Sequence, residues 1–380
     1  MNIKNLSLEE KIGQMFMVGI NDKNIEPLYK LIENNKIGGV ILYKKNYASY
    51  DEMIEVIKKL KNANKNNKIP LFISIDQEGG RVNRMPKELA NIRNVYELSS
   101  LNKINLIRKN ADITSRMLIE SGVNMNFAPV LDIYNDSNSN VLFKRCFSKE
   151  VDTVSKYGIC YMKQMQHNMV IPVVKHFPGH GASVRDSHFF VPYVKNTNEI
   201  LNKHIIPFAK AIENDCDAIM VGHLVIKDLT NGLPASISNT FIKEYLRGKY
   251  KYDGLIITDD IKMGSINLIY KFISFKKAFS SGSDIILFKY SNGDEKHIKK
   301  IIKRTKEKQF DINEIDKSVD RILKMKTKYK INDNIDFLGC DIAKINKEIN
   351  SINKLYDEGV ANEKEWSKEI LCISNENVTS

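Results

Sequence analysis

The chain has 380 residues, of which 42% are hydrophobic and 27% are charged, and its formal net charge is +12. This composition is typical of a globular protein with a substantial core and excludes a disordered or fibrous chain. The lysines lie in helical stretches that also carry acidic residues, such as 294–308, and they form no basic stripe with interleaved aromatic residues. We therefore do not expect a nucleic-acid-binding protein.

The N-terminal segment and the cysteines bear on the location of the protein. Residues 1–20 carry acidic side chains directly before their apolar run and have no small-residue cleavage site, so we do not interpret them as a signal peptide. No apolar stretch reaches the length of a membrane-spanning helix. The five cysteines form no CxxC pair, which favours reduced thiols over a disulfide framework or a zinc site. We expect a cytoplasmic protein without a membrane partner.

Short apolar runs rich in β-branched residues recur along the chain and predict eight strands separated by helices. The strands are expected at Met15–Gly19, Gly39–Tyr43, Leu71–Ile75, Met125–Pro129, Ile171–Val174, Ala218–Val221, Leu255–Ile257 and Asp284–Phe288. The helices are expected at Ile25–Asn34, Tyr50–Asn62, Lys103–Gly122, Asp152–Asn168, Asn198–Asn214, Thr240–Arg247, Tyr270–Ser280 and Glu295–Lys308. Eight strands alternating with helices favour an α/β fold of the (β/α)₈ TIM-barrel type. A doubly wound sheet would show a similar alternation, so the count favours the barrel without proving it.

Polar residues gather where the predicted strands end. These clusters are Asp76–Arg81, Asp132, Lys175-His176, His223 and Asp259-Asp260. In a barrel, the C-terminal ends of the strands meet at one rim, and active sites are built there. The sequence therefore predicts an active site at that rim.

The segment Lys175–His188, KHFPGHGASVRDSH, combines a strand end with a glycine-rich loop. Asp186 lies two residues before His188, and this spacing allows the carboxylate to orient the imidazole and raise its basicity for proton transfer. Gly179 and Gly181 would let the loop open and close. The alternatives are a metal site or a structural turn, but the combination of residues favours acid–base chemistry.

The barrel is expected to form one catalytic domain, residues 1–330, closed by a helix at Ile315–Lys330. Residues 331–380 form a C-terminal tail that is too short for a domain of its own. Within the tail we expect a helix near Ile342–Val360 and a short apolar run at Ile370–Ile373.

Seven motifs occur in a specific order along most of the chain. They are LEEKIGQMFMVG (Leu8–Gly19), DQEGGRVNR (Asp76–Arg84), NFAPVLDI (Asn126–Ile133), KRCF (Lys144–Phe147), KHFPGHG…DSH (Lys175–His188), PASIS (Pro234–Ser238) and DGLIITDDIKM (Asp253–Met263). With these motifs the chain resembles family-3 glycoside hydrolases, and within them the β-N-acetylglucosaminidases of bacterial cell-wall recycling.

The resemblance implies a role for each candidate site residue. Asp259 would be the nucleophile of a retaining reaction, and His188 with Asp186 would be the acid/base dyad. Substrate would be held or lined by Asp76, Arg84, Arg145, Lys175, His176, His223 and Met263. Of these, His223 and Met263 are expected on the pocket wall. No metal or other cofactor is implied.

Three polar residues near these positions are interpreted as structural. Asp260 would form a salt bridge or anchor a loop, because the side chain after Asp259 on an extended strand points elsewhere. Arg81 would pair with Glu78, and His180 would support the glycine-rich loop.

The tail raises the question of a second domain. Residues 354–373 are faintly similar to the helix and first strand that open a second domain in longer family members, so we interpret the tail as its possible remnant. If such a remnant exposes apolar surface, dimerisation would cover it. We expect a monomer or a weak homodimer.

The expected function is an exo-acting retaining β-N-acetylglucosaminidase that releases terminal β-linked GlcNAc from peptidoglycan-derived muropeptides, a small-molecule carbohydrate substrate. Two enzymatic alternatives in the same family are a β-N-acetylglucosaminide phosphorylase, which would use phosphate as acceptor, and a β-glucosidase. A third alternative, from another class, is a non-catalytic muropeptide-binding protein. That reading predicts damage to Asp259, Asp186 or His188, and all three residues are present.

Overall fold

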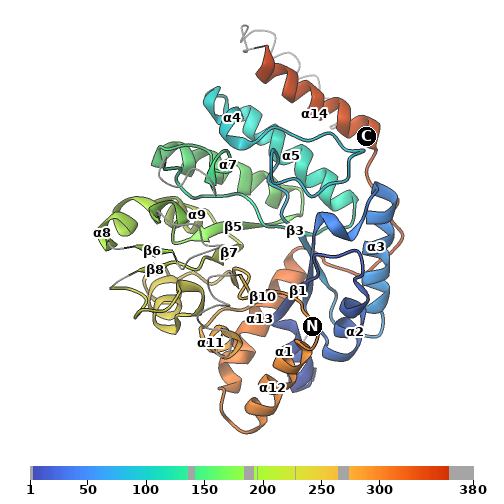
Figure 1. Cartoon of the computed structure of the whole chain (residues 1–380), viewed down its shortest axis with the longest axis vertical. Coiled ribbons are helices and arrows are strands. Elements are labelled where there is room, and N and C mark those ends of the chain that lie inside the picture. Colours follow the sequence, from blue (N-terminus) through green and yellow to red (C-terminus); the bar gives the residue numbers. More distant parts are fainter. Residues whose placement is uncertain are drawn as a thin grey trace.

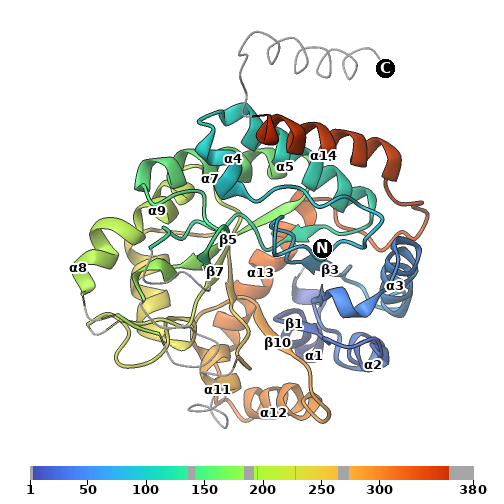
Figure 2. The same ribbon diagram turned by 45° about the horizontal axis from the view of Figure 1, so that its top comes forward.

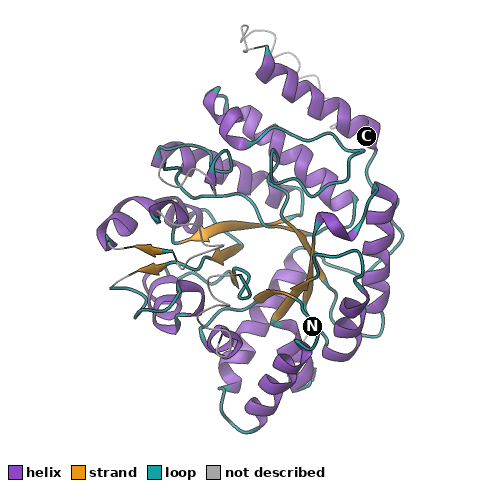
Figure 3. Cartoon of the chain, viewed as in Figure 1, coloured by secondary structure: helices purple, strands orange, loops and turns teal. Residues whose placement is uncertain are grey.

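Eight parallel strands form the centre of the molecule, and helices surround them (Figures 1 and 3). The structure is a computed structural model that describes residues 3–135, 142–183, 192–194, 196–226, 228–263 and 274–358. The strands are β1 (Phe16–Gly19), β2 (Gly39–Leu42), β3 (Phe72–Ile75), β4 (Met125–Asn126), β5 (Ile171–Phe177), β7 (Ala218–Val221), β9 (Leu255–Thr258) and β10 (Ile286–Lys289). Each of the eight predicted strands is thereby confirmed.

The strand order shows that the sheet closes on itself. It runs β10-β1-β2-β3-β4-β5-β7-β9, with parallel pairing between neighbours. A parallel bridge between Ile257 and Ile285 joins β9 to the residue before β10, so the two ends of the sheet meet. This closure confirms the (β/α)₈ barrel and excludes the doubly wound sheet.

The barrel strands are covered on both faces, by the barrel interior and by the helix layer. Their sequences are therefore continuous apolar runs and do not alternate between apolar and polar residues. Seven of the eight barrel strands are buried along their whole length, and β10 is exposed only at its last residue. The largest buried side chains on these strands include Phe16, Phe72, Phe177 and Phe288. β5 continues beyond the predicted Val174, so that Lys175 and His176 lie within a strand and are held by its pairing.

The predicted helices are present, with two interruptions. The helices are α2 (Glu26–Asn35), α3 (Tyr50–Ala63), α5 (Ile104–Glu120), α7 (Val151–His167), α9 (Ile206–Glu213), α11 (Ser274–Ser280), α12 (Glu295–Lys306) and α13 (Ile312–Lys328). The predicted Asn198–Asn214 helix is divided into α8 (Thr197–Glu199), a π-helical turn η5 (Ile200–His204) and α9, and η7 (Phe241–Lys249) is π-helical throughout. The start of the predicted Tyr270–Ser280 helix lies outside the described residues.

Several elements were not predicted. They are α1 (Leu8–Gln14), α4 (Val95–Ser100), the strand pair β6 (Tyr193–Val194) and β8 (Val225–Ile226), and the 3₁₀ turns η1 (Ile3–Asn5), η2 (Lys44–Asn46), η4 (His180–Ala182) and η6 (Ala235–Ile237). Each is short, so its hydrophobic period is too brief to stand out in the sequence.

Helix α13 ties together the N-terminal ends of three strands through one buried lysine. Lys326 Nζ donates to Gln14 Oε1 at 2.7 Å, to the Gly38 carbonyl at 2.9 Å and to the Pro70 carbonyl at 2.6 Å. It also lies 4.4 Å from the ring centroid of Phe72. The three acceptors come just before β1, β2 and β3, so this ammonium group anchors α13 under the barrel.

The C-terminal tail lies against the barrel. Residues 331–341 belong to no helix or strand, and α14 (Ile342–Asp357) then packs on α5 (Figures 1 and 2). The predicted tail helix is thus present, whereas the run Ile370–Ile373 lies outside the described residues. The division into a 1–330 domain and a domain remnant stays a prediction. Within the described ranges, no helix combines the length and the hydropathy needed to cross a membrane.

Candidate active site

A cavity of about 530 Å³ opens at the C-terminal rim of the barrel. Seven of the predicted site residues line it: Asp76, Arg84, Arg145, Lys175, His176, Asp259 and Met263. They follow or end β3, β5 and β9 or lie on nearby loops, so the barrel brings together residues that are up to 187 positions apart (263 − 76 = 187). The structure thus gathers these seven residues around one cavity at the rim where the active site is expected.

Lys175 lies at the centre of a buried charge network in the cavity. Its Nζ atom is 2.7 Å from Asp76 Oδ1 and 2.7 Å from Glu78 Oε1. Arg145 binds the same Glu78 through two hydrogen bonds, each 2.8 Å long. Burial alone would raise the pKa of Glu78, but the charges of Arg145 and Lys175 outweigh it and hold this pKa well below its usual range. The network keeps two cations fixed and charged beside the cavity.

Glu78 bonds to two cations from distant parts of the chain, and Arg81 lines the same cavity. Burial and the neighbouring charge of Arg145 lower the pKa of Arg81, while the charge of Glu78 opposes this shift. The predicted pairing of Arg81 with Glu78 stays a prediction.

His176 is oriented by a fully buried carboxylate. Asp132 Oδ2 lies 2.7 Å from His176 Nδ1, and the two carboxylate oxygens each lie 3.3 Å from the His176 backbone nitrogen. Asp132 Oδ1 also accepts the backbone N–H of His180 at 2.6 Å. Burial would raise the pKa of Asp132, yet the interaction with His176 lowers it. The pairing leaves the Nε2 side of the His176 ring to face the cavity that this residue lines.

Asp259 lies directly after β9 in a position suited to a nucleophile. Its backbone N–H donates to the Val221 carbonyl at 3.0 Å, which holds it to β7, and its Oδ1 accepts the Asp260 N–H at 2.7 Å. Burial would raise the pKa of Asp259, but the interactions with His223 and His176 and the Asp260 N–H lower it. The carboxyl group is therefore ionised near neutral pH, as attack on carbon requires.

Asp260 anchors the loops beside Asp259. Its Oδ1 accepts the backbone N–H of Lys262 at 2.9 Å and that of Lys289 at 3.2 Å, so it ties the end of β9 to the end of β10. Burial raises the pKa of Asp260. The two adjacent aspartates thus differ in environment, in agreement with the separate roles expected for them.

The structure places His223 behind Asp260, where it is buried and is not among the residues lining the cavity. Its Nε2 donates to the Asp260 carbonyl at 2.9 Å, and its Nδ1 is 2.7 Å from Ser236 Oγ. His223 was predicted to lie on the pocket wall, and the structure does not place it there. Its contact instead holds the backbone that carries Asp259.

The predicted dyad residues Asp186 and His188 lie outside the described residues. The proton-transfer assignment therefore stays a prediction. The two glycines before them are described, and close packing explains both: a Cβ atom on Gly179 would lie 2.6 Å from His204 Cβ, and one on Gly181 would lie 2.0 Å from the Ile133 carbonyl oxygen. These contacts account for the glycines without a hinge.

His180 lines the cavity and stands next to His176. The ring centroids are 5.9 Å apart in an edge-to-face arrangement. Burial lowers the pKa of His180 to about 4, so the ring is neutral under most conditions. It was expected to support the loop, and its backbone bond to Asp132 is consistent with that role.

The cavity is also lined by residues that were not predicted as site residues, and Tyr43 and Lys289 are two polar examples. Tyr43 follows β2 directly, and Lys289 ends β10; both line the cavity. Their strand-end positions are the same signal that identified the other candidates, so both could have been found. Across the described ranges, His, Cys, Asp and Glu side chains form no group of three or more that could hold a metal ion.

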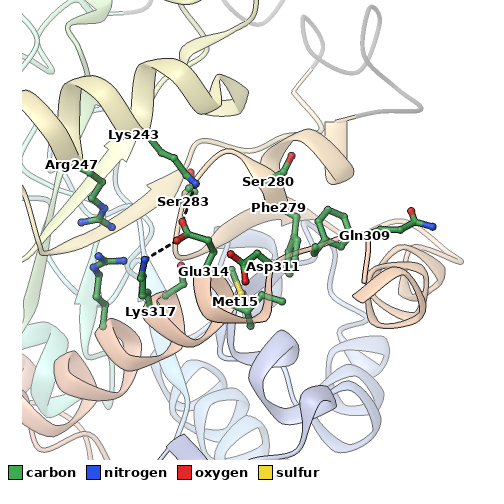
Figure 4. Close-up of a pocket in the computed structure, with 15 residues that line it drawn as sticks. Met15, Lys243, Arg247, Phe279, Ser280, Ser283, Gln309, Asp311, Glu314 and Lys317 are labelled. Atoms are coloured by element: carbon green, nitrogen blue, oxygen red, sulfur yellow. Dashed lines mark hydrogen bonds and ion pairs between the residues drawn. The ribbon is translucent and has the colours of Figure 1, made fainter. Parts of the chain in front are cut away.

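A second cavity, of about 490 Å³, lies at the opposite end of the strands (Figure 4). Met15, just before β1, and Ser283, before β10, line it. Glu314 lies between Lys243 and Lys317, at 2.9 and 2.8 Å, so the two ammonium groups are paired within the protein. This cavity contains none of the predicted site residues.

Comparison with known proteins agrees with this picture. Residues 7–325 match the family model described as "Glycosyl hydrolase family 3 N terminal domain". The chain is 30% identical over 328 residues to "Beta-hexosaminidase A" of Pseudoalteromonas piscicida, an alignment that covers 79% of this chain and 55% of that protein. The chain thus spans little more than half the length of that relative.

Two further matches span a larger share of the relative's own length. The chain is 31% identical over 265 residues to "Beta-hexosaminidase" of Haemophilus influenzae (strain PittEE), covering 68% of this chain and 74% of that protein. A solved glycoside hydrolase family 3 β-N-acetylglucosaminidase from Paenibacillus sp. str. FPU-7 superposes with a TM-score of 0.83 at 28% identity, covering 91% of this chain and 68% of that chain.

Proposed function

The chain belongs to glycosyl hydrolase family 3, and on this basis we propose that it is an exo-acting retaining β-N-acetylglucosaminidase. Its substrate would be terminal β-linked GlcNAc on peptidoglycan-derived muropeptides. The observation that carries the proposal is the ionised carboxylate of Asp259, partly exposed in the same cavity as the cationic side chains of Lys175 and Arg145. The relatives named β-hexosaminidase support the choice of an acetamido sugar.

In this mechanism Asp259 attacks the anomeric carbon and forms a glycosyl ester, which water then hydrolyses with retention. His188, paired with Asp186, protonates the leaving oxygen in the first step and deprotonates water in the second. His223 supports the reaction indirectly, because its bond to the Asp260 carbonyl fixes the backbone beside the nucleophile.

The charge network would recognise the terminal sugar. Two of the three N–H bonds of Lys175 are directed to Asp76 and Glu78, which leaves a third for a sugar hydroxyl. Asp76 is partly exposed to the cavity and can accept from sugar hydroxyls, and Arg84 and His176 can donate to sugar oxygens from its wall. Because Lys175 and Asp76 are held by the network and His176 by Asp132, these side chains lose little freedom when the sugar binds.

Hydrolysis of a chromogenic β-GlcNAc substrate by the wild type and by Asp259→Ala tests the proposal. We expect turnover by the wild type and loss of at least about 10³-fold in the variant, because the covalent route is removed. Equal rates in both proteins would contradict the assignment of the nucleophile. Binding of GlcNAc without any turnover by the wild type would favour the non-catalytic alternative, and turnover that requires phosphate would favour the phosphorylase.

A further inference from the structure

A long irregular loop carries a large part of the cavity wall. Residues 76–94 join β3 to α4, and the first part of this β3–α4 loop supplies Asp76, Glu78 and Arg84 to the cavity. Ordering an irregular segment costs conformational entropy, which its contacts must offset. The contacts that hold this loop therefore decide how well the cavity is formed before substrate arrives.

The second half of the loop holds the first half. The Gly80 N–H donates to the Ile92 carbonyl at 2.8 Å, and Asn91 Nδ2 donates to the Gly80 carbonyl at 2.7 Å. Gly80 has a φ of +57°, and a Cβ atom on it would lie 2.7 Å from Asn94 Cβ. The turn that follows Glu78 thus packs closely on residues 91–94, and the position of the turn depends on the position of those residues.

Helix α14 is hydrogen-bonded to the second half of the loop through Asn346. The side-chain oxygen of Asn346 accepts the Ala90 N–H at 2.7 Å, and its Nδ2 donates to the Glu88 carbonyl at 2.8 Å. The side-chain amide therefore bonds the carbonyl of one loop residue and the N–H of the residue two positions later. A neighbouring strand would bond an extended segment in the same way.

Asn353 repeats this contact further along the helix. Its side-chain oxygen accepts the Arg93 N–H at 3.1 Å, and its Nδ2 donates to the Asn91 carbonyl at 3.1 Å. The same loop residue, Arg93, also packs its guanidinium 4.4 Å from the ring centroid of Tyr356 and pairs with Asp357. Both asparagines bond to the main chain of the loop, so they determine its path whatever its side chains are.

The spacing of the two asparagines matches the loop. They are seven residues apart on α14, which corresponds to about 10.5 Å along a helix. The carbonyls that they bond, those of Glu88 and Asn91, are three residues apart, and Glu88 lies in the turn closed by the Leu89 N–H and the Pro86 carbonyl. The helix engages both points of the loop at once.

The helix itself is firmly attached to the barrel. Its apolar stripe, Ile345, Ile349 and Ile352, is buried, and α14 packs on α5 (Figures 1 and 2). Glu348 binds Arg116 at 2.6 Å and Lys109 at 2.7 Å, and both of these residues belong to α5. The asparagines are thus presented from a fixed surface.

We infer that α14 is a positioning element of the active site: Asn346 and Asn353 fix residues 88–93, and these in turn fix the glycine turn that carries Glu78. The tail then contributes to catalysis although none of its described residues, 331–358, lines the cavity. The catalytic part of this inference rests on the proposed function. The structural part concerns only the order of the loop.

The test uses the full chain with Asn346→Ala, Asn353→Ala and the double substitution. Asn350→Ala is the matched control, because Asn350 is exposed on the same helix and its replacement changes helix propensity equally. Amide hydrogen exchange at Ala90, Arg93 and Gly80 reports on the loop, and KM and kcat on the chromogenic β-GlcNAc substrate report on catalysis.

We expect exchange at Ala90 and Arg93 to accelerate at least about fivefold in the double variant, because each amide loses its acceptor. Exchange at Gly80 accelerates as well, since its acceptor Ile92 lies in the released segment. KM rises about three- to tenfold while kcat changes less than about twofold, as expected when a binding surface loses order. Asn350→Ala behaves as the wild type. If the double variant does not fold, the single variants show the same pattern with smaller effects.

Unchanged exchange at Gly80 despite faster exchange at Ala90 and Arg93 would overturn the inference, because the helix would then order only its own contacts. Unchanged KM with a disordered Gly80 would overturn the catalytic part. If the wild type does not hydrolyse the β-GlcNAc substrate, the proposed function fails, and exchange at Gly80 still decides whether α14 orders the loop.

Discussion

The Nδ1 atom of His176 lies 2.7 Å from the Oδ2 atom of Asp132, and both side chains are buried at the rim of the barrel. The same carboxylate accepts the backbone N–H of His180, so one buried charge holds a strand and the loop that follows it. Asp132 does not line the cavity, and it acts on the site through His176 and His180.

Asp132→Asn tests this relationship. The amide keeps the shape of the side chain but removes the charge and replaces one acceptor oxygen by a donor, so the His176 ring loses its preferred orientation. We expect kcat/KM for the β-GlcNAc substrate to fall about 10- to 100-fold, since hydrogen bonds to charged groups contribute about 1.5–3 kcal/mol. An unchanged kcat/KM in a variant whose Tm is also unchanged would show that the orientation of His176 is unimportant.

The sequence predicted the barrel well because its strands are buried on both faces. β7, Ala218–Val221, has the predicted bounds, since the polar Asp217 and the flexible Gly222 delimit its apolar run. β5 is longer than predicted. It continues through Lys175 to Phe177 because these residues pair with neighbouring strands, although Lys175 and His176 are polar.

The side-chain pairing in the site was harder to predict. Glu78 binds Arg145 and Lys175, which the barrel brings from later strands and loops, and neither of these contacts was predicted. The contacts of Asn346 and Asn353 were not predictable at all, since a side chain that bonds to the backbone leaves no mark in the sequence of its partner. The end of a strand can be recognised from the residues around it in the sequence. The partners of these side chains are far away in the sequence and meet only when the barrel closes.

The ionisation of Asp259 predicts the acid side of the pH–rate profile. Because its pKa in the folded protein is lowered from an ordinary value of about 3.9, the nucleophile stays charged at all pH values above about 4. We expect kcat/KM for the β-GlcNAc substrate to show no loss from this group between pH 5 and 7. A profile measured from pH 4 to 9, with reassay at pH 7 after each incubation, checks this. A reversible fall of kcat/KM centred above about pH 5 would contradict the assignment if it persisted in variants of the other titratable side chains of the site.

The charge network of Glu78 predicts how stability depends on pH. The pKa of Glu78 is lowered in the folded protein, whereas the unfolded chain titrates near about 4.3, so below that pH the unfolded state binds a proton that the folded state does not. The stabilisation is therefore present above about pH 4.3 and is lost as the pH falls, at up to about 1.4 kcal/mol per pH unit. We expect the Tm of Glu78→Gln to be lower than that of the wild type at pH 6 and to fall less steeply between pH 5 and 3.5. Parallel Tm curves for the two proteins would show that Glu78 does not titrate in this window.

Lys326 offers a test of stability that is separate from catalysis. Its ammonium group donates to three oxygens at the N-terminal ends of β1, β2 and β3, and its side chain is 3% exposed. In Lys326→Met the acceptors lose their donor inside the protein, at a cost of about 1–3 kcal/mol for each unsatisfied group. We expect the free energy of unfolding to fall by at least about 3 kcal/mol, as measured by urea denaturation.

The matched control is Lys324→Met, two residues away on α13, where the lysine is 70% exposed and pairs only at the surface with Asp320. Surface pairs of this kind contribute about 0–1 kcal/mol, so this variant should unfold close to the wild type. Lys326 lies at the end of the barrel opposite the cavity, so kcat/KM of folded Lys326→Met should equal that of the wild type. A loss of stability no larger than that of Lys324→Met would mean that the three carbonyl and amide oxygens find other donors, and that the lysine does not anchor α13 under the barrel.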